Sequence, residues 1–317
     1  MVYGLVAALG WGLSAVAATN AARRAGTFVA VLCAQGLGVL LLIVLAVALQ
    51  PSFATAGGAV ALSLAGAGIL GLLGYLAFYR ALEHGGGVGL VSAISATYGG
   101  VTTVLAVALL GEHLGVGGAV GVVLAVAGIA LAAARPAKGA KGSGDDADDA
   151  ESTEPAASVA VAEPMVGVAP APSRIRSLSR AGVPLAIVAA LAYGVGGFVL
   201  GKYSAKAGWL TAALVAHGAS VTVMLMALLL FRRRTAWRGN MRGVLWAGAA
   251  GLTDAIGLLA FSRGGQAGQV AVTAAVSSVF PVIPLVAGVL LFGEHLTRRQ
   301  LTGVCGIIAG LVLIGVG

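Results

Sequence analysis

Ten runs of predominantly apolar residues recur along this chain, each about as long as a membrane-crossing helix. A helix that spans the hydrocarbon core of a bilayer needs about 20 such residues, whereas the strands of a membrane β-barrel are shorter and alternate in polarity. We therefore predict an all-α integral membrane protein with ten transmembrane helices. The predicted helices cover residues 2–22, 28–49, 59–82, 87–110, 114–134, 183–205, 208–231, 243–263, 268–292 and 300–317.

Charged residues are too rare for a soluble protein of this length. They make up 9% of the 317 residues, against 59% hydrophobic residues, whereas soluble domains carry about 25% charged residues. This composition excludes a soluble enzyme, a disordered protein and a nucleic-acid binder, even though the net charge is +8. Both cysteines, Cys33 and Cys305, lie inside apolar runs, so we expect neither a disulfide framework nor a multi-cysteine metal site.

One segment, residues 135–181, differs from the rest of the chain. It is rich in Pro, Ala, Ser and acidic residues, and 13 of the charged residues lie within 135–180. A segment of this composition buries too little apolar surface to offset the entropy lost on ordering it. We predict a disordered charged linker at 135–181 that joins two membrane units, residues 1–134 and 182–317.

Short motifs recur in the same order in the two units, at a separation of 182 or 183 residues. The paired segments are 5–9 with 187–191, 11–12 with 193–194, 76–80 with 259–263, and 111–114 with 293–296. Since five helices are an odd number, the second copy must enter the membrane from the opposite side. We therefore predict two inverted five-helix repeats, an architecture of secondary transporters that bind their substrate near the midplane between the repeats.

The repeated motifs resemble those of the EamA family of the drug/metabolite transporter superfamily. The resemblance rests on the aromatic–glycine pairs at 11–12 and 193–194, the Gly-Glu-His-Leu turns at 111–114 and 293–296, and the segment 277–294. It covers all ten predicted helices but not the linker. The fourth helix departs from the pattern, because Thr97-Tyr98-Gly99 stands where the family usually has a proline. The resemblance implies a secondary active transporter, most often an exporter, that moves small organic metabolites or drugs by alternating access.

Motifs of ATP-driven pumps and of hydrolases do not occur in the sequence. A Gly-x-Gly-x-x-Gly match at 66–71 lies within an apolar run, with no strand before it, and so does not indicate a dinucleotide site. We expect no enzymatic activity and no cofactor. The expected partners are a small-molecule substrate, protons and the lipid bilayer. Two other functions stay open, a flippase for a lipid-linked intermediate and a non-transporting membrane scaffold that uses the charged linker.

Basic residues gather on one side of the predicted helices. The loops after odd-numbered helices, together with the linker, carry 16 of the 19 lysines and arginines. Because basic loops tend to stay in the cytoplasm, the charges predict a plasma-membrane protein with both termini outside and the linker in the cytoplasm. The family resemblance implies the opposite orientation, since EamA proteins usually place both termini in the cytoplasm.

Asp254 is an acidic residue in the middle of the eighth predicted helix. An ionisable side chain at this depth is costly and is a candidate functional residue. Gly251 and Gly257 flank it at three-residue spacing, and we expect them to leave room for substrate or water. Asp254 either binds a proton or a cation, or it is a structural carboxylate paired with a hydroxyl group or with Lys202.

Further polar and aromatic residues are aligned between the two units. His217 and its counterpart Gln35 either line a shared cavity, where histidine can relay protons, or form a hydrogen bond between helices. The aromatic pairs either enclose an organic substrate or face lipid, and Pro281 and Pro284 predict a kink in the ninth helix. The aromatic candidates are Trp11 with Tyr193 and Tyr98 with Phe280.

Overall fold

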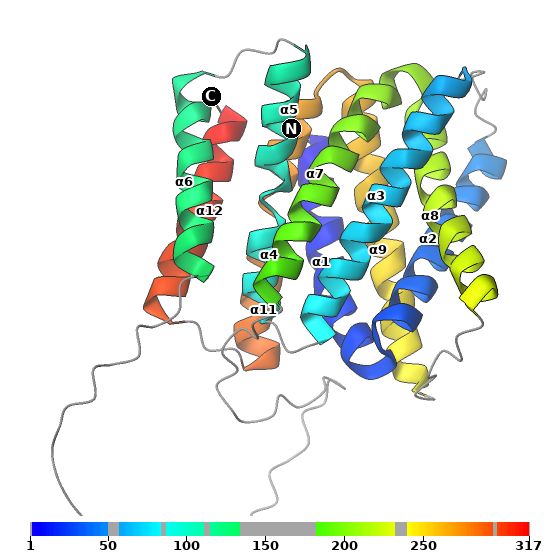
Figure 1. Cartoon of the computed structure of the whole chain (residues 1–317), viewed down its shortest axis with the longest axis horizontal. Helices are drawn as coiled ribbons and strands as arrows, with labels where there is room; N and C mark the ends of the chain where they lie inside the picture. Colours follow the sequence, from blue (N-terminus) through cyan, green and yellow to red (C-terminus); the bar gives the residue numbers. More distant parts are fainter. Residues whose placement is uncertain are drawn as a thin grey trace, which may run out of the picture.

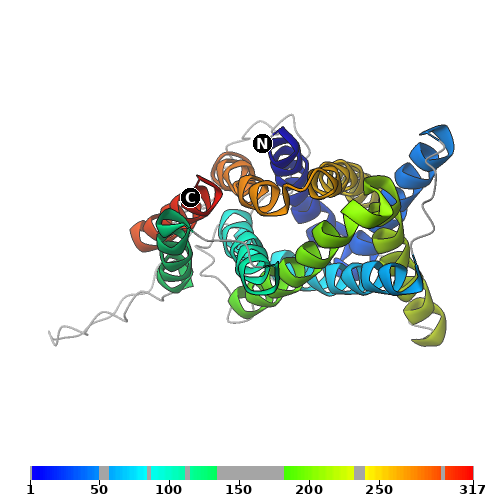
Figure 2. The same ribbon diagram turned by 90° about the horizontal axis from the view of Figure 1, so that it is seen from above.

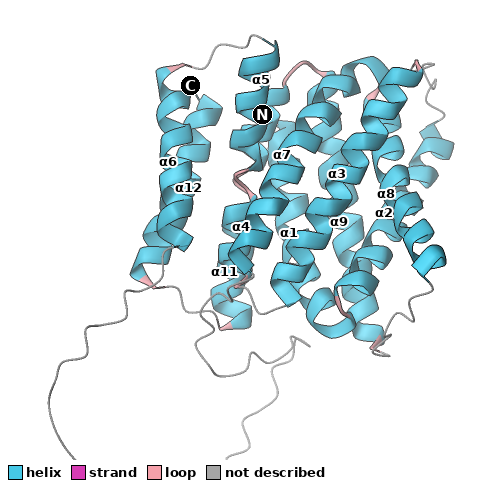
Figure 3. Cartoon of the chain, in the orientation of Figure 1, coloured by secondary structure: helices cyan, strands magenta, loops and turns pink. Residues whose placement is uncertain are grey.

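The computed structural model describes residues 2–49, 57–83, 87–110, 115–133, 182–231, 240–293 and 297–316. In these ranges the chain is helical and contains no strand (Figure 3), which confirms the all-α prediction. The predicted linker at 135–181 and the turn at 111–114 lie outside the described residues, as does the second turn at 293–296 except for Gly293.

The described part of the chain forms twelve helices. Eight segments are long and apolar enough to cross a membrane, with α4 and α5 counted as one segment and α10 and α11 as another. The other two predicted runs form α6 and α12, which pack against each other at one side of the bundle (Figures 1 and 2). The helices are α1 (Val2–Ala25), α2 (Thr27–Leu49), α3 (Gly58–Glu83), α4 (Val88–Ser95), α5 (Tyr98–Leu110), α6 (Val116–Ala133), α7 (Gly182–Ala207), α8 (Trp209–Phe231), α9 (Met241–Gln266), α10 (Val270–Ser277), α11 (Val282–Phe292) and α12 (Arg298–Val316).

The ninth predicted helix is interrupted near its middle, where its prolines predict a kink. The first part, α10, ends at Ser277, and α11 begins at Val282, directly after Pro281. Proline cannot donate a backbone hydrogen bond to the preceding turn and clashes with it. The interruption therefore lies at the predicted position but is a complete break in the helix.

The fourth predicted helix is also broken, although its sequence has no proline there. Two turn residues, Ala96 and Thr97, separate α4 from α5, and the Thr97 hydroxyl donates to the Ile94 carbonyl at 2.7 Å. A Cβ atom on Gly99 would overlap the side chain of Ser278. The two breaks therefore lie side by side.

Helices of the first half, α1–α6, pack mainly against helices of the second half, α7–α12. The pairs are reciprocal, because α1 packs on α9 while α3 packs on α7, and α2 packs on α9 while α3 packs on α8. In Figure 2 the helices of the two halves interleave around a common centre. The interface between the halves is thus the core of the molecule.

Two glycines at equivalent positions allow these helices to approach each other closely. A Cβ atom on Gly68 of α3 would overlap the carbonyl of Ala216 on α8, and one on Gly251 of α9 would overlap the carbonyl of Ala34 on α2. Small residues at such crossings are typical of membrane helix packing. The same backbone contact is therefore made twice, once by each half.

A second pair of glycines supports the aligned aromatic residues of the first helices. A Cβ atom on Gly74 would lie 2.5 Å from the ring of Tyr193, and one on Gly257 would lie 2.8 Å from the indole of Trp11. The prediction that Gly251 and Gly257 leave room beside Asp254 is therefore wrong. At both glycines the space beside the backbone is occupied by another helix, at Gly251 by Ala34 of α2 and at Gly257 by Trp11 of α1.

Candidate functional site

A cavity of about 130 Å³ lies between the two halves of the bundle. Its lining comes from α1, α3, α7, α8 and α9, from the ends of α4 and α5 at one helix break, and from Phe280 at the other. Eight of the lining side chains are aromatic, and small residues and leucines make up most of the remainder. Among the described residues, the cavity lining includes one carboxylate and one imidazole but no lysine or arginine.

Asp254 and His217 form a polar cluster with Tyr75 at this cavity. The Tyr75 hydroxyl donates to Asp254 Oδ2 at 2.6 Å, and His217 Nε2 lies 3.4 Å from the same oxygen. Asp254 is 6% exposed and His217 is 4% exposed. Three helices, α3, α8 and α9, therefore bring their polar groups to a single carboxylate oxygen.

Of the two structural partners predicted for Asp254, a hydroxyl group and Lys202, the structure places only the hydroxyl group beside the carboxylate. The hydroxyl partner exists and belongs to Tyr75. Lys202 is elsewhere, with its ammonium group over the rings of Phe198 and Tyr203 at 5.8 and 5.7 Å. Among the described residues, the carboxylate thus has a hydrogen-bond donor and an imidazole as neighbours and no lysine ion pair.

Gln35, the counterpart of His217, occupies a small side pocket of about 10 Å³. This pocket shares Tyr75, Tyr79 and Asp254 with the main cavity. Gln35 is buried, and its Oε1 atom has no hydrogen-bond partner in the described part of the chain. Gln35 therefore lies next to Asp254 and presents an unsatisfied acceptor there.

The predicted aromatic residues Trp11, Tyr98, Tyr193 and Phe280 all line the cavity. Trp11 meets the edge of Tyr98 at a centroid distance of 5.8 Å and lies 5.5 Å from the ring of Phe261. Tyr193 meets Tyr75 edge-on at 5.4 Å. Trp11, Tyr98 and Tyr193 thus pack against other rings, and all four residues line the cavity, so of the two alternatives the structure favours the cavity over lipid.

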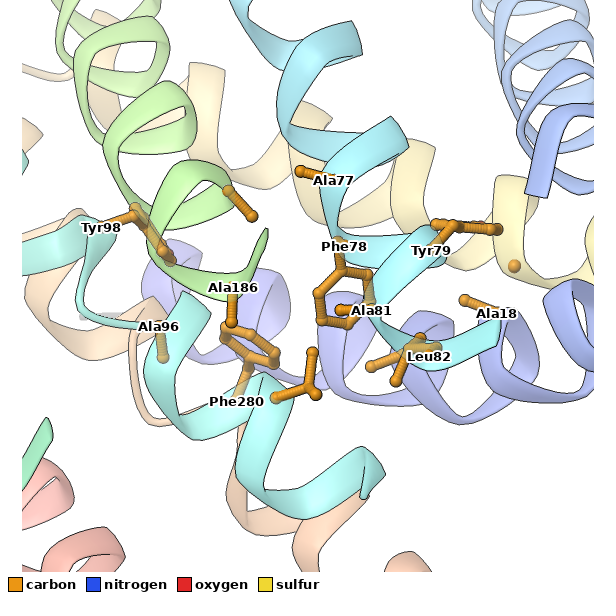
Figure 4. Close-up of a cluster of buried hydrophobic side chains, with 14 of the residues drawn as sticks. Ala18, Ala77, Phe78, Tyr79, Ala81, Leu82, Ala96, Tyr98, Ala186 and Phe280 are labelled. Carbon is orange, nitrogen blue, oxygen red and sulfur yellow. The ribbon is translucent and has the colours of Figure 1, made fainter. Parts of the chain in front are cut away.

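Four further aromatic residues of the lining are not predicted from the sequence. Phe78 and Phe261 occupy the same position in the repeated segments 76–80 and 259–263, so the repeat indicates them as candidate cavity residues. Tyr75 and Tyr79 correspond to Leu258 and Ser262 and lack such a signal. Figure 4 shows Phe78, Tyr79, Tyr98 and Phe280 within one buried cluster.

Comparison with known proteins gives a family and a fold. Residues 1–134 and 180–316 match the EamA-like transporter family. A solved structure, described only as the crystal structure of a protein, resembles this chain with a TM-score of 0.65 at 17% sequence identity; the match covers 98% of this chain and 94% of that chain. No curated protein sequence matches the chain.

Proposed function

The chain belongs to the EamA-like transporter family, and we propose that it is a secondary active transporter that exports small organic molecules. The observation that carries the proposal is the cavity between the two halves, with Asp254 and His217 in its wall. A pocket with mostly apolar walls and a few convergent polar groups is typical of a small-molecule site. The substrate would occupy this cavity between Trp11, Tyr98 and Tyr193.

Alternating access is the proposed mechanism, in which two inverted five-helix repeats move around the cavity. The reciprocal packing of α1 on α9 and of α3 on α7 supports a two-fold relation between the halves. The first and last described residues lie at the same face of the bundle (Figure 1), as expected if α6 and α12 complete ten spans. Inverted repeats that rock around a fixed midplane site are a recurring transporter mechanism.

Asp254 and His217 are the proposed coupling residues, which take up a proton when the cavity is free of substrate. The His217 imidazole lies beside one oxygen of the Asp254 carboxylate. A proton bound to either group brings the net charge of the pair to zero. A proton gradient would then supply the energy. Gln35 and Phe280 would contact the substrate or support the groups that do.

The protein would lie in the plasma membrane with both termini outside and residues 135–181 in the cytoplasm. The basic residues support this orientation, since the ends of α1 and α3 carry Arg23, Arg24 and Arg80, and basic segments favour the cytoplasmic side. A reporter that is active only in the cytoplasm, fused at Gly317, tests it. Activity of that fusion would reverse the orientation.

A flippase and a scaffold are weaker candidates than a transporter. In the described residues the cavity wall contains one carboxylate and no lysine or arginine, which makes it a poor site for a prenyl phosphate. Deletion of residues 140–172 distinguishes the scaffold, because it would abolish a scaffold function and leave transport nearly intact.

Asp254→Asn tests the proposed function in proteoliposomes with an imposed pH gradient. A pH-sensitive dye in the lumen reports proton flux while aromatic amino acids, organic amines, carboxylates and nucleosides are added one class at a time. We expect one class to drive proton flux through the wild-type protein and Asp254→Asn to lose the gradient-driven component. Glu83→Gln is the matched control, because Glu83 binds the start of α2, outside the cavity, through Thr27. Full gradient-driven transport by Asp254→Asn would remove that residue from coupling.

A further inference from the structure

We propose that the cavity binds a small organic monocation, an ammonium group attached to about one aromatic ring, and exchanges it for one proton. This inference rests on the proposed transport function and specifies its substrate class. It follows from three independent features of the cavity: its charge, its aromatic walls and its size.

The charge of the cavity favours a cation. Asp254 is the one carboxylate among the described lining residues, and neither lysine nor arginine accompanies it. Lys202 lies over aromatic rings elsewhere on α7. A substrate carboxylate would lie beside Asp254 with neither a lysine nor an arginine of the described lining to bind it. Because like charges in contact repel strongly, such a substrate is disfavoured. A positive group would neutralise the buried carboxylate.

The aromatic walls supply a second attraction for a cation. Trp11, Tyr75 and Tyr193 line the same cavity as Asp254, together with five further rings. Aromatic faces carry negative potential, and such cages bind quaternary ammonium ions. Tyr75 takes part in both effects, since its hydroxyl holds Asp254 Oδ2 while its ring packs on Tyr193.

The size of the cavity limits the substrate to about one ring. Its volume is about 130 Å³, slightly below the cavity of about 150 Å³ that is known to hold benzene, so a ring would fill it and the attached ammonium group would need the adjoining side pocket, which shares Asp254. Two buried acceptors are available to an N–H group, Ser95 Oγ in the cavity wall and Gln35 Oε1 in the side pocket. Neither has a hydrogen-bond partner in the described part of the chain.

Exchange with a proton follows from the neighbours of Asp254. The titratable groups that line the cavity with the carboxylate are Tyr75 and Tyr79 on α3, Tyr193 on α7 and His217 on α8. Helices α1 and α2 contribute Trp11 and Gln35, which do not titrate. When the cation enters, the proton held by the Asp254–His217 pair leaves for the water on the side to which the cavity is open. The net charge of the occupied cavity then stays unchanged.

The test compares three phenyl compounds that differ in charge. Isothermal titration of the full chain in nanodiscs measures the binding of phenyltrimethylammonium, phenylalanine and 3-phenylpropionate. We expect the cation to bind, and the zwitterion and the anion to bind at least about tenfold more weakly. If one proton leaves when the cation binds, the Kd of the cation rises as the pH falls, by up to about tenfold for each pH unit.

Variants separate the carboxylate from a general effect on the fold. Asp254→Asn should weaken cation binding at least about tenfold, and Tyr75→Phe, which keeps the ring, should weaken it by about tenfold, the effect of losing one hydrogen bond to a charged group. Glu83→Gln should bind the cation as the wild type does. Melting temperatures check that each variant is folded, and Tyr75→Phe keeps the test open if Asp254→Asn does not fold.

Three results would overturn the proposal of a cationic substrate, and they bear differently on the transport function. If phenylalanine or 3-phenylpropionate binds as tightly as phenyltrimethylammonium and drives proton flux that depends on Asp254, the protein is a transporter of another substrate class. If the cation binds equally to Asp254→Asn, the charge argument fails. If no compound of any class moves through the wild-type protein in proteoliposomes, both proposals fail together.

Discussion

The two halves of this protein pack alike but carry different chemistry. Gly68 and Gly251 make the same backbone contact at equivalent positions. Gly74 and Gly257 likewise each receive an aromatic ring of the opposite half. A change at any of these positions would push apart two helices, so the packing positions of both copies have stayed equivalent.

The polar positions of the cavity differ between the halves, although several aromatic positions are alike. Asp254 corresponds to Gly71 and His217 to Gln35, while Tyr75, the hydrogen-bond donor to Asp254, corresponds to Leu258. The second half thus provides the ionisable pair, and the first half provides the phenol that binds it. A duplicated membrane fold therefore keeps its helix crossings symmetric, whereas side chains that face the cavity are free to specialise.

The largest expected effect is on the shared packing. Gly68→Ala and Gly251→Ala each place a methyl group inside a carbonyl of the neighbouring helix, and we expect each to lower the free energy of unfolding by about 3 kcal/mol, the upper range for overpacking. Thermal melting in detergent measures this. The two values should agree, because the contacts are equivalent.

Gly66→Ala is the control for this prediction. Gly66 also lies on α3, but a Cβ atom there meets no other atom within 4 Å. Alanine is the better helix former by about 1 kcal/mol, so this variant should be as stable as the wild type or slightly more stable. Tolerance of alanine at one of Gly68 and Gly251 but not at the other would break the symmetry of the packing.

The next effect concerns the asymmetry of the cavity. Moving the carboxylate to the first half, with Gly71→Asp and Asp254→Gly together, keeps the charge of the cavity, and a Cβ atom at Gly71 has open space. The moved carboxylate would lose the equivalents of the Tyr75 phenol and the His217 imidazole, because Leu258 and Gln35 stand in their places. We expect cation affinity to fall about 100-fold, as for the loss of strong hydrogen bonds to a charged group.

A second swap variant adds Leu258→Tyr and Gln35→His to restore both neighbours. We expect it to recover a substantial part of the affinity of phenyltrimethylammonium, measured by titration. Wild-type affinity of the first swap variant would contradict the asymmetry, since the position of the carboxylate would then be unimportant. Melting temperatures identify variants whose loss comes from unfolding.

The sequence predicts the helices well, because a bilayer demands apolar runs of a minimum length. It also predicts a kink at Pro281 and Pro284, where the structure has a complete break before Val282. The break at Ala96 and Thr97 has no proline to indicate it, and the close approach of Gly99 to Ser278 beside it comes from another helix. Local sequence cannot report a contact that another helix imposes.

The candidate site is predictable where the repeat or an unusual residue marks it. Trp11, Tyr193 and Asp254 are found in this way, and all three line the cavity. Tyr75 is missed because it lies in an apolar run and has a leucine as its counterpart. Gly257 is misinterpreted for a similar reason, since its spacing from Asp254 says nothing of the indole that lies against it. Both errors concern partners from other helices.

The smallest expected effect concerns a hydrogen bond that one half makes and the other lacks. The Thr102 hydroxyl on α5 donates to the Gly194 carbonyl on α7 at 3.0 Å, whereas the counterpart of Thr102 is Pro284, which has no donor. Hydrogen bonds between membrane helices contribute about 0.6 kcal/mol on average, so Thr102→Val should lower the melting temperature by about 1–2 °C. It should leave cation binding unchanged, because Thr102 is outside the cavity wall.

Thr222→Val is the control, since Thr222 donates only to Gly218 of its own helix. A large loss of stability or transport in Thr102→Val would mean that the packing of the two halves, and not only their cavity chemistry, has diverged.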